Sequence, residues 1–413
     1  MIDANNTVSF LKAWKQKRGL MSPLSPKGAS SDAWQQAEML FSLGIIHHFG
    51  DVARDHLRRE TENSHLLRER LPSVDREPFL FWEAVVNKVA IEIGARRIGY
   101  HVIPEVLFDT LERASVNAVT LKVDGTEDYI VLIDLGLLLF TSLTATILED
   151  AWRQLPRQLL EFDGVPDYDA VSFAVNKKPG LPLRFGRLLT SALLEEDFLH
   201  STPGIMSDDV VGSNPFIKPV SANDPVAGKL PSAIEVFMLG HEYGHILANH
   251  LSGAEAPDSG IKVFKFDAGS AIPVELSDEA RTYWNQEVQA DAIALDLVFE
   301  VARQRGWYFD VAFAGVDLFL SCVDYLEKGV NVIRRGNTDV PANLDHPPTY
   351  TRRDCLRKRV RETMDPNVSD MLIRCGELME CLAKIFFHKV TPFLVRAHVA
   401  GTPLASSFRP IST

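Results

Sequence analysis

The spacing of apolar residues predicts a chain built mostly of helices. Apolar positions recur three and four residues apart in several long stretches, which is the period of an amphipathic helix. The expected helices cover residues 79–100, 232–251, 278–304, 311–328, 350–363 and 369–387. Two short runs rich in β-branched residues, 118–123 and 129–133, flank the turn residues Asp124 and Gly125. The expected fold class is therefore α+β, mainly helical, with a small sheet.

Changes in residue pattern divide the chain into five regions. Residues 1–75 form an N-terminal helical region, 76–150 the first half of a core, 151–230 an insertion, 231–365 the second half of the core, and 366–413 a C-terminal helical region. Five prolines and three glycines between residues 203 and 231 disfavour helix and strand. A loop of that length is typically a lid, a binding loop or a mobile linker, so residues 202–231 are a candidate lid.

Residues 129–148 are apolar enough to raise the question of a membrane span. Asp134 lies inside this stretch, and a charge near the bilayer centre costs about 3 kcal/mol on insertion scales. A buried strand followed by a buried helix explains the same residues without that cost. We therefore expect no membrane partner.

Composition limits which binding partners and which cellular compartment are expected. The chain has 413 residues, is 46% hydrophobic and carries a formal net charge of -12. An acidic chain is poorly suited to neutralise phosphates, so nucleic acid is not an expected partner. The N-terminus lacks the uninterrupted apolar run of a signal peptide. The four cysteines have no CxxC spacing, which favours a cytoplasmic location: Cys322, Cys355, Cys375 and Cys381.

An HExxH pattern lies inside the helix expected over residues 232–251. His241 and His245 are four residues apart, so both imidazoles can face one metal ion. Glu242 follows the first histidine and can act as general base toward a water that the metal activates. The pattern also arises by chance on ordinary helices, but two histidines on an apolar face are hard to satisfy without a ligand.

A third ligand is available on the helix expected over residues 278–304. Glu287 and Asp291 are four residues apart on one face, next to Ala290 and Ala294. Glu287 is the candidate ligand, and Asp291 is a candidate for orienting a ligating histidine. The alternative is a solvated acidic face. The neighbouring apolar residues favour partial burial, and buried carboxylates need a cation.

His250 is not expected to be a ligand. It lies five residues after His245, which places it off the metal face of a continuing helix. The metzincin pattern requires a histidine one residue later, where this chain has Leu251.

Four sequence blocks, in order, resemble the gluzincin peptidases typified by HtpX and the CaaX-processing prenyl protease, with their Oma-type relatives. The last three blocks together are specific, and the resemblance covers a little under half of the chain. The blocks are Asn117-Ala118 with residues 129–138, similar to a strand segment of the family; His241–His245 with His250, similar to HExGHxxxxH; Glu287–Asp291, similar to ExxAD; and His346-Pro347-Pro348-Thr349 with Arg352, similar to HP…R.

The resemblance implies a zincin-like catalytic domain with extra helices at both ends. It also implies zinc bound by His241, His245 and Glu287, with Glu242 as catalytic base. His346 would lie beside the metal and either stabilise an oxyanion or cap the zinc in a resting state, although a loop that separates two helices explains the same residues. Arg352 is expected to anchor this loop to a carboxylate rather than contact substrate.

Two hypotheses of different classes follow. The first is a zinc endopeptidase that cleaves a protein or peptide substrate, and one form of it is a gated peptidase in which residues 202–231 or a regulatory partner control access to the cleft. The second is a zinc-binding regulatory or scaffold protein without hydrolytic activity. The presence of Glu242 favours the first hypothesis, because the base is needed only for hydrolysis.

Overall fold

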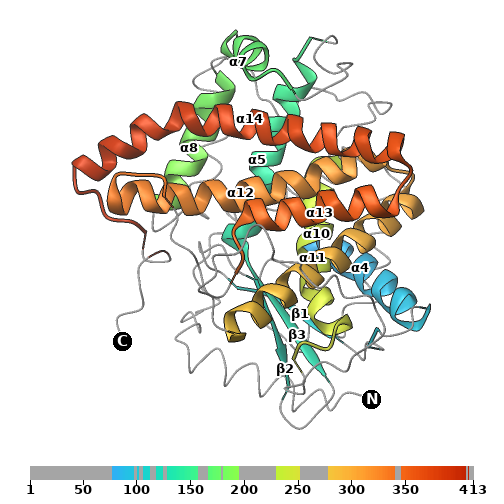
Figure 1. Cartoon of the computed structure of the whole chain (residues 1–413). Coiled ribbons are helices and arrows are strands. Elements are labelled where there is room, and N and C mark those ends of the chain that lie inside the picture. Colours follow the sequence, from blue (N-terminus) through green and yellow to red (C-terminus); the bar gives the residue numbers. More distant parts are fainter. Residues whose placement is uncertain are drawn as a thin grey trace.

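The computed structural model describes residues 77–96, 100–101, 106–111, 118–123, 128–156, 166–177, 180–194, 229–251, 278–339, 346–405 and 408. These residues form a mainly helical structure with one small sheet, as the apolar spacing predicts (Figure 1). The N-terminal region 1–75 lies outside the described residues. So does the candidate lid, apart from residues 229–231, which begin a helix.

The sheet contains the strands β1 (Val106–Leu111), β2 (Ala118–Lys122) and β3 (Tyr129–Asp134), in the order β1-β3-β2. β3 pairs with β1 in parallel and with β2 antiparallel, and each of its residues is buried. The apolar pattern did not predict β1, whose sequence VLFDTL has no strict alternation. Among the described strands, β2 and β1 are the outer ones.

Helix α5 (Leu135–Arg153) follows β3 directly, as expected for the apolar stretch 129–148. Within the described part of the chain it is the one helix long and apolar enough to cross a membrane, and 72% of its apolar window is buried inside the protein. A buried core helix passes the same test of length and composition as a membrane-spanning helix.

The remaining helices are α4 (Glu77–Arg96), α7 (Tyr168–Asn176), α8 (Gly180–Leu194), α10 (Lys229–Leu247), α11 (Asp278–Arg305), α12 (Phe309–Arg335), α13 (Thr349–Thr363) and α14 (Pro366–Val399). Of these helices, α4 and α10 pack on the sheet, and α8, α10, α12 and α14 pack on α5. The long helices α12 and α14 run side by side, and α7 lies at the end of the molecule opposite the sheet (Figure 1). Both α7 and α8 pack on α14, and α8 also packs on α5, so part of the predicted insertion belongs to the helical body.

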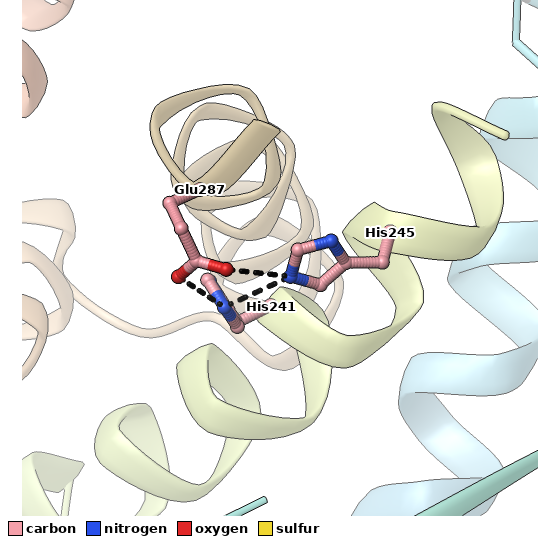
Figure 2. A group of neighbouring side chains, drawn as sticks. All are labelled: His241, His245 and Glu287. Atoms are coloured by element: carbon pink, nitrogen blue, oxygen red, sulfur yellow. Dashed lines mark hydrogen bonds and ion pairs between the residues drawn. The ribbon is translucent and has the colours of Figure 1, made fainter. Parts of the chain in front are cut away.

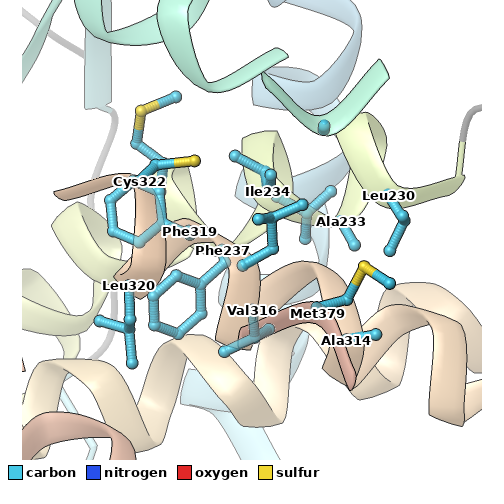
Figure 3. Close-up of a cluster of buried hydrophobic side chains, with 14 of the residues drawn as sticks. Leu230, Ala233, Ile234, Phe237, Ala314, Val316, Phe319, Leu320, Cys322 and Met379 are labelled. Carbon is cyan, nitrogen blue, oxygen red and sulfur yellow. The ribbon is translucent and has the colours of Figure 1, made fainter. Parts of the chain in front are cut away.

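The HExxH helix α10 is held by a buried apolar cluster (Figure 3). Phe237 packs edge-on against Phe319 of α12, with ring centroids 5.5 Å apart. Gly315 of α12 lets the two helices approach, because a Cβ there would lie 2.6 Å from the Cβ of Ala233. Each fully buried large apolar side chain contributes about 1.5–3 kcal/mol. This apolar packing therefore holds α10 in place independently of the contacts that its histidines make.

Helix α10 ends earlier than the sequence suggests. The pattern predicts a helix to residue 251, but α10 stops at Leu247 and a turn covers residues 248–251. Asn249 adopts a left-handed conformation with φ of 58°, a common way to end a helix. The turn directs the following residue, His250, back toward the helix.

Candidate metal centre

Two small residues bring the helices α10 and α11 into close contact. A Cβ at Gly244 would lie 2.7 Å from the carbonyl oxygen of Ala290, and one at Gly240 would lie 3.2 Å from the Cα of Ala294. Only glycine permits backbone approach of this kind at Gly244. The glycine inside the HExxH motif thus sets the distance between the two helices that carry the candidate ligands.

The side chains of His241, His245 and Glu287 converge at this contact (Figure 2). The donor atoms of the three residues all lie within 4.8 Å of one another, so the group could hold a metal ion. The Nε2 atoms of the two histidines are 3.2 Å apart. Glu287 Oε2 lies 3.4 Å from His241 Nε2, and Glu287 Oε1 lies 3.4 Å from His245 Nε2.

Burial and charge at this group are compatible with a bound cation. Burial lowers the pKa of His241, but the charge of Glu287 and the hydrogen bond to Asp291 outweigh it and raise that pKa to about 10. Burial raises the pKa of Glu287, yet the charge of His241 and the hydrogen bond from its ring outweigh burial and hold that pKa well below its usual range. An ionised carboxylate beside two imidazoles fits a bound cation.

Asp291 holds His241 from the side opposite the candidate metal position. Asp291 Oδ1 lies 2.9 Å from His241 Nδ1. Arg352 of α13 donates to the same carboxylate from Nε (2.7 Å, to Oδ2) and from Nη2 (2.6 Å, to Oδ1). Burial raises the pKa of Asp291, but the charge and hydrogen bonds of Arg352 outweigh it and keep the group ionised. An ionised Asp291 accepts the Nδ1 proton of His241 and leaves Nε2 directed at the candidate site.

His245 has a different partner, which the sequence argument did not identify. Its Nδ1 lies 2.9 Å from Nδ1 of His250, and His250 Nε2 lies 3.0 Å from Oε1 of Gln289 on α11. His250 is not among the converging donors, in agreement with its exclusion as a ligand. The prediction that His250 lies on a continuing helix is wrong, however, because this residue lies in the turn that follows α10.

Glu242 is buried between α10 and the sheet. Thr120 of β2 donates its hydroxyl to Glu242 Oε2 at 2.7 Å, and the same hydroxyl lies 3.2 Å from the backbone carbonyl oxygen of Glu242. Thr120 was not identified from the sequence, because it lies 122 residues away in a strand without a motif. This contact places the edge strand β2 beside Glu242.

His346 lies at the exposed side of the group. Its Nδ1 is 3.0 Å from Glu287 Oε2, and its side chain is 51% exposed. The segment that carries it leads into α13, which Arg352 ties to α11. Arg353 of α13 also donates to Asp317 of α12 at 2.5 Å and contacts Glu380 of α14 at 3.2 Å. The helix after His346 is therefore fixed to three neighbouring helices.

Comparison of the chain with models of protein families, with curated proteins and with solved structures finds no match.

Proposed function

We propose that this protein is a zinc-dependent endopeptidase of the gluzincin type, with a zincin-like catalytic domain. The observation that carries the proposal is the convergence of His241, His245 and Glu287, with Glu242 one residue after the first histidine. Two imidazole nitrogens and one carboxylate oxygen are a common catalytic zinc set, which leaves a fourth position open. The resemblance of the HExxH, ExxAD and HP segments to the gluzincins supports the same assignment.

The reaction assigned to this site is hydrolysis of a peptide bond. His241, His245 and Glu287 would hold the zinc, which when bound would supply a Lewis acid able to lower the pKa of a water molecule and to polarise a peptide carbonyl. Glu242 accepts the proton of the attacking water and passes it to the nitrogen of the leaving amine. Thr120 holds one oxygen of Glu242, which restricts its rotation and directs the other oxygen.

His346 is proposed to assist at the oxyanion. Its ring is half exposed and lies next to Glu287, so it can reach a substrate that enters from solvent. A hydrogen bond donated by the imidazole to the developing negative charge would stabilise the transition state. The anchored helix α13 limits the movement of the segment that carries this residue.

The substrate is proposed to be an extended peptide that pairs with β2. β3 is paired on both sides and cannot accept another strand. β2 is an outer strand among the described residues, and Thr120 in its middle contacts the proposed base. A peptide added to β2 would place its backbone beside Glu242.

Glu242→Gln tests the proposal with an unfolded casein-like substrate. Glutamine keeps the size and the hydrogen bond from Thr120 but cannot accept the proton. We expect hydrolysis to fall by about 100- to 10,000-fold while zinc stays bound. Zinc binding together with wild-type activity in this variant would remove Glu242 as the base. Zinc binding without any hydrolysis by the wild type would favour the scaffold hypothesis.

A further inference from the structure

The turn after α10 places an unusual pair of hydrogen-bonding groups behind His245. His250 lies between His245 and Gln289, with a ring nitrogen 2.9 Å from the first and 3.0 Å from the side-chain oxygen of the second. Each ring nitrogen of His250 is therefore engaged. The left-handed Asn249 makes this arrangement possible, because it ends the helix and turns the chain back.

The donor and acceptor atoms along these contacts allow one direction of hydrogen-bond donation, from His245 to His250 and from His250 to Gln289. The side-chain oxygen of Gln289 can only accept, so Nε2 of His250 carries a proton. A neutral His250 then has a lone pair on Nδ1, which faces Nδ1 of His245. One proton must lie between these two nitrogens, and it belongs to His245. His245 thus has its proton on Nδ1 and its lone pair on Nε2, the atom directed at Glu287.

We propose that Gln289 and His250 form a positioning pair that fixes the tautomer and ring orientation of His245 for metal binding. The inference rests on the proposed metal centre and assigns a role to two residues that do not bind the ion. It also distinguishes the two histidine ligands. His241 is backed by the charged pair Asp291 and Arg352, whereas His245 is backed by an imidazole and a carboxamide.

The difference has a chemical consequence. A carboxylate behind a histidine ligand makes that ligand more basic, while a neutral acceptor does so less. A carboxylate behind His245, in addition to Asp291 behind His241, would place one more buried negative charge close to Glu287. The neutral pair orients His245 without adding that charge.

Zinc affinity of the full chain, measured by competition with a chromophoric chelator, tests the pair. His250→Leu removes the acceptor but keeps an apolar side chain in the turn, and Gln289→Leu removes only the outer partner. We expect zinc to bind about 10- to 100-fold more weakly to His250→Leu, with a smaller loss for Gln289→Leu. His250→Asn should restore affinity, because its side-chain oxygen can accept from His245 near the position of the lost nitrogen.

His398→Leu is the matched control. His398 is also half-buried and makes one hydrogen bond, from its ring to the carbonyl oxygen of Ile333, but it lies outside the metal group. Unchanged affinity in this variant would show that loss of a hydrogen-bonded histidine elsewhere does not matter. Wild-type affinity in both His250→Leu and Gln289→Leu would overturn the pair and leave the proposed peptidase untouched.

The ¹⁵N NMR spectrum of the metal-free protein tests the tautomer of His245 without zinc. We expect a protonated Nδ1 and an unprotonated Nε2 for His245, and a change in this pattern in Gln289→Leu. A proton on Nε2 of His245 in the wild type would overturn the pair. Failure of the wild type to bind zinc would instead remove the proposed function, and the spectrum would still show whether the pair sets the tautomer.

Discussion

At the scale of single residues, the side chains of the candidate centre are held in place by neighbouring polar groups. His241 faces Glu287 with Nε2 and Asp291 with Nδ1. Glu242 is held by Thr120, which comes from the sheet and not from a neighbouring helix. Such contacts reduce the number of rotamers that a functional side chain can adopt, and a catalytic constellation depends on that restriction.

Thr120→Val should lower hydrolytic activity without loss of zinc. The variant removes the hydroxyl that donates to Glu242 while it keeps the side-chain volume. A hydrogen bond to a charged group contributes about 1.5–3 kcal/mol, so we expect a roughly 10- to 100-fold decrease in kcat. Thr120→Ser keeps the hydroxyl and should retain most of the activity. Equal activity of the valine and serine variants would contradict a positioning role for Thr120.

The residues recognisable from sequence are those with short, regular spacing. His241, Glu242 and His245 share one helical turn, and Glu287 belongs to a second short motif. Thr120 has no such signal, because its contact with Glu242 depends on how the sheet packs on α10. His250 was visible in the motif, but its position behind His245 depends on the conformation of Asn249. Residue type and spacing therefore predict the candidate metal ligands and base better than the residues that hold them in place.

At the scale of elements, the approach of α10 to α11 determines whether the donors can meet. The long helices were predicted well because their apolar faces pack on one another over many turns, as in α12 and α14. Their ends were predicted less well, since α12 and α14 each extend beyond the apolar pattern. Strand β1 was missed because parallel pairing with β3, rather than alternation, makes it a strand.

Gly244→Ala should weaken both folding and zinc binding. The added methyl group would lie 2.7 Å from the carbonyl oxygen of Ala290, and backbone at that distance must move. Overpacking of this kind costs about 1–3 kcal/mol, measurable by urea unfolding. Chelator competition should show weaker zinc binding, because Glu287 moves with α11. Gly186→Ala is the control, since its methyl group meets only the two side-chain methyl carbons of Val390, at 3.1 and 3.9 Å, and no backbone. Unchanged zinc binding in Gly244→Ala would contradict this account of the helix contact.

At the scale of the whole molecule, the candidate centre lies inside a larger helical body than the motif segments alone would form. Helices α7 and α8, from the predicted insertion, pack on α14. The C-terminal helix α14 packs along α12, which also packs on the HExxH helix α10. The parts of the chain without a readable motif thus support the helix that carries the histidines.

The stability of this body should fall as pH rises from about 5 to 8. Burial raises the pKa of Glu235 to about 7, although the hydrogen bond from Ser142 of α5 partly opposes the shift. Since the pKa of the folded state is raised, the folded protein holds a proton that the unfolded chain releases above about 4.5. Its stabilising effect is complete below that pH and is lost as pH rises through about 7. The expected loss is roughly 3 kcal/mol.

Urea unfolding of the wild type and Glu235→Gln at pH 5 and pH 8 measures this effect. Glutamine does not ionise, so the variant should lose less stability than the wild type over this range. Glu362→Gln is the control, because Glu362 is exposed at the end of α13. An equal loss of stability in the wild type and Glu235→Gln would show that Glu235 does not carry the dependence.

The most direct test of the central claim is the metal content of the purified protein, measured by elemental analysis. Wild type, His245→Ala, Glu287→Ala and Glu242→Gln are compared after reconstitution with zinc. The account predicts about one zinc per chain in the wild type and in Glu242→Gln, and loss of zinc in the two ligand variants. Absence of zinc from the wild type, or full zinc content in both ligand variants, would contradict it.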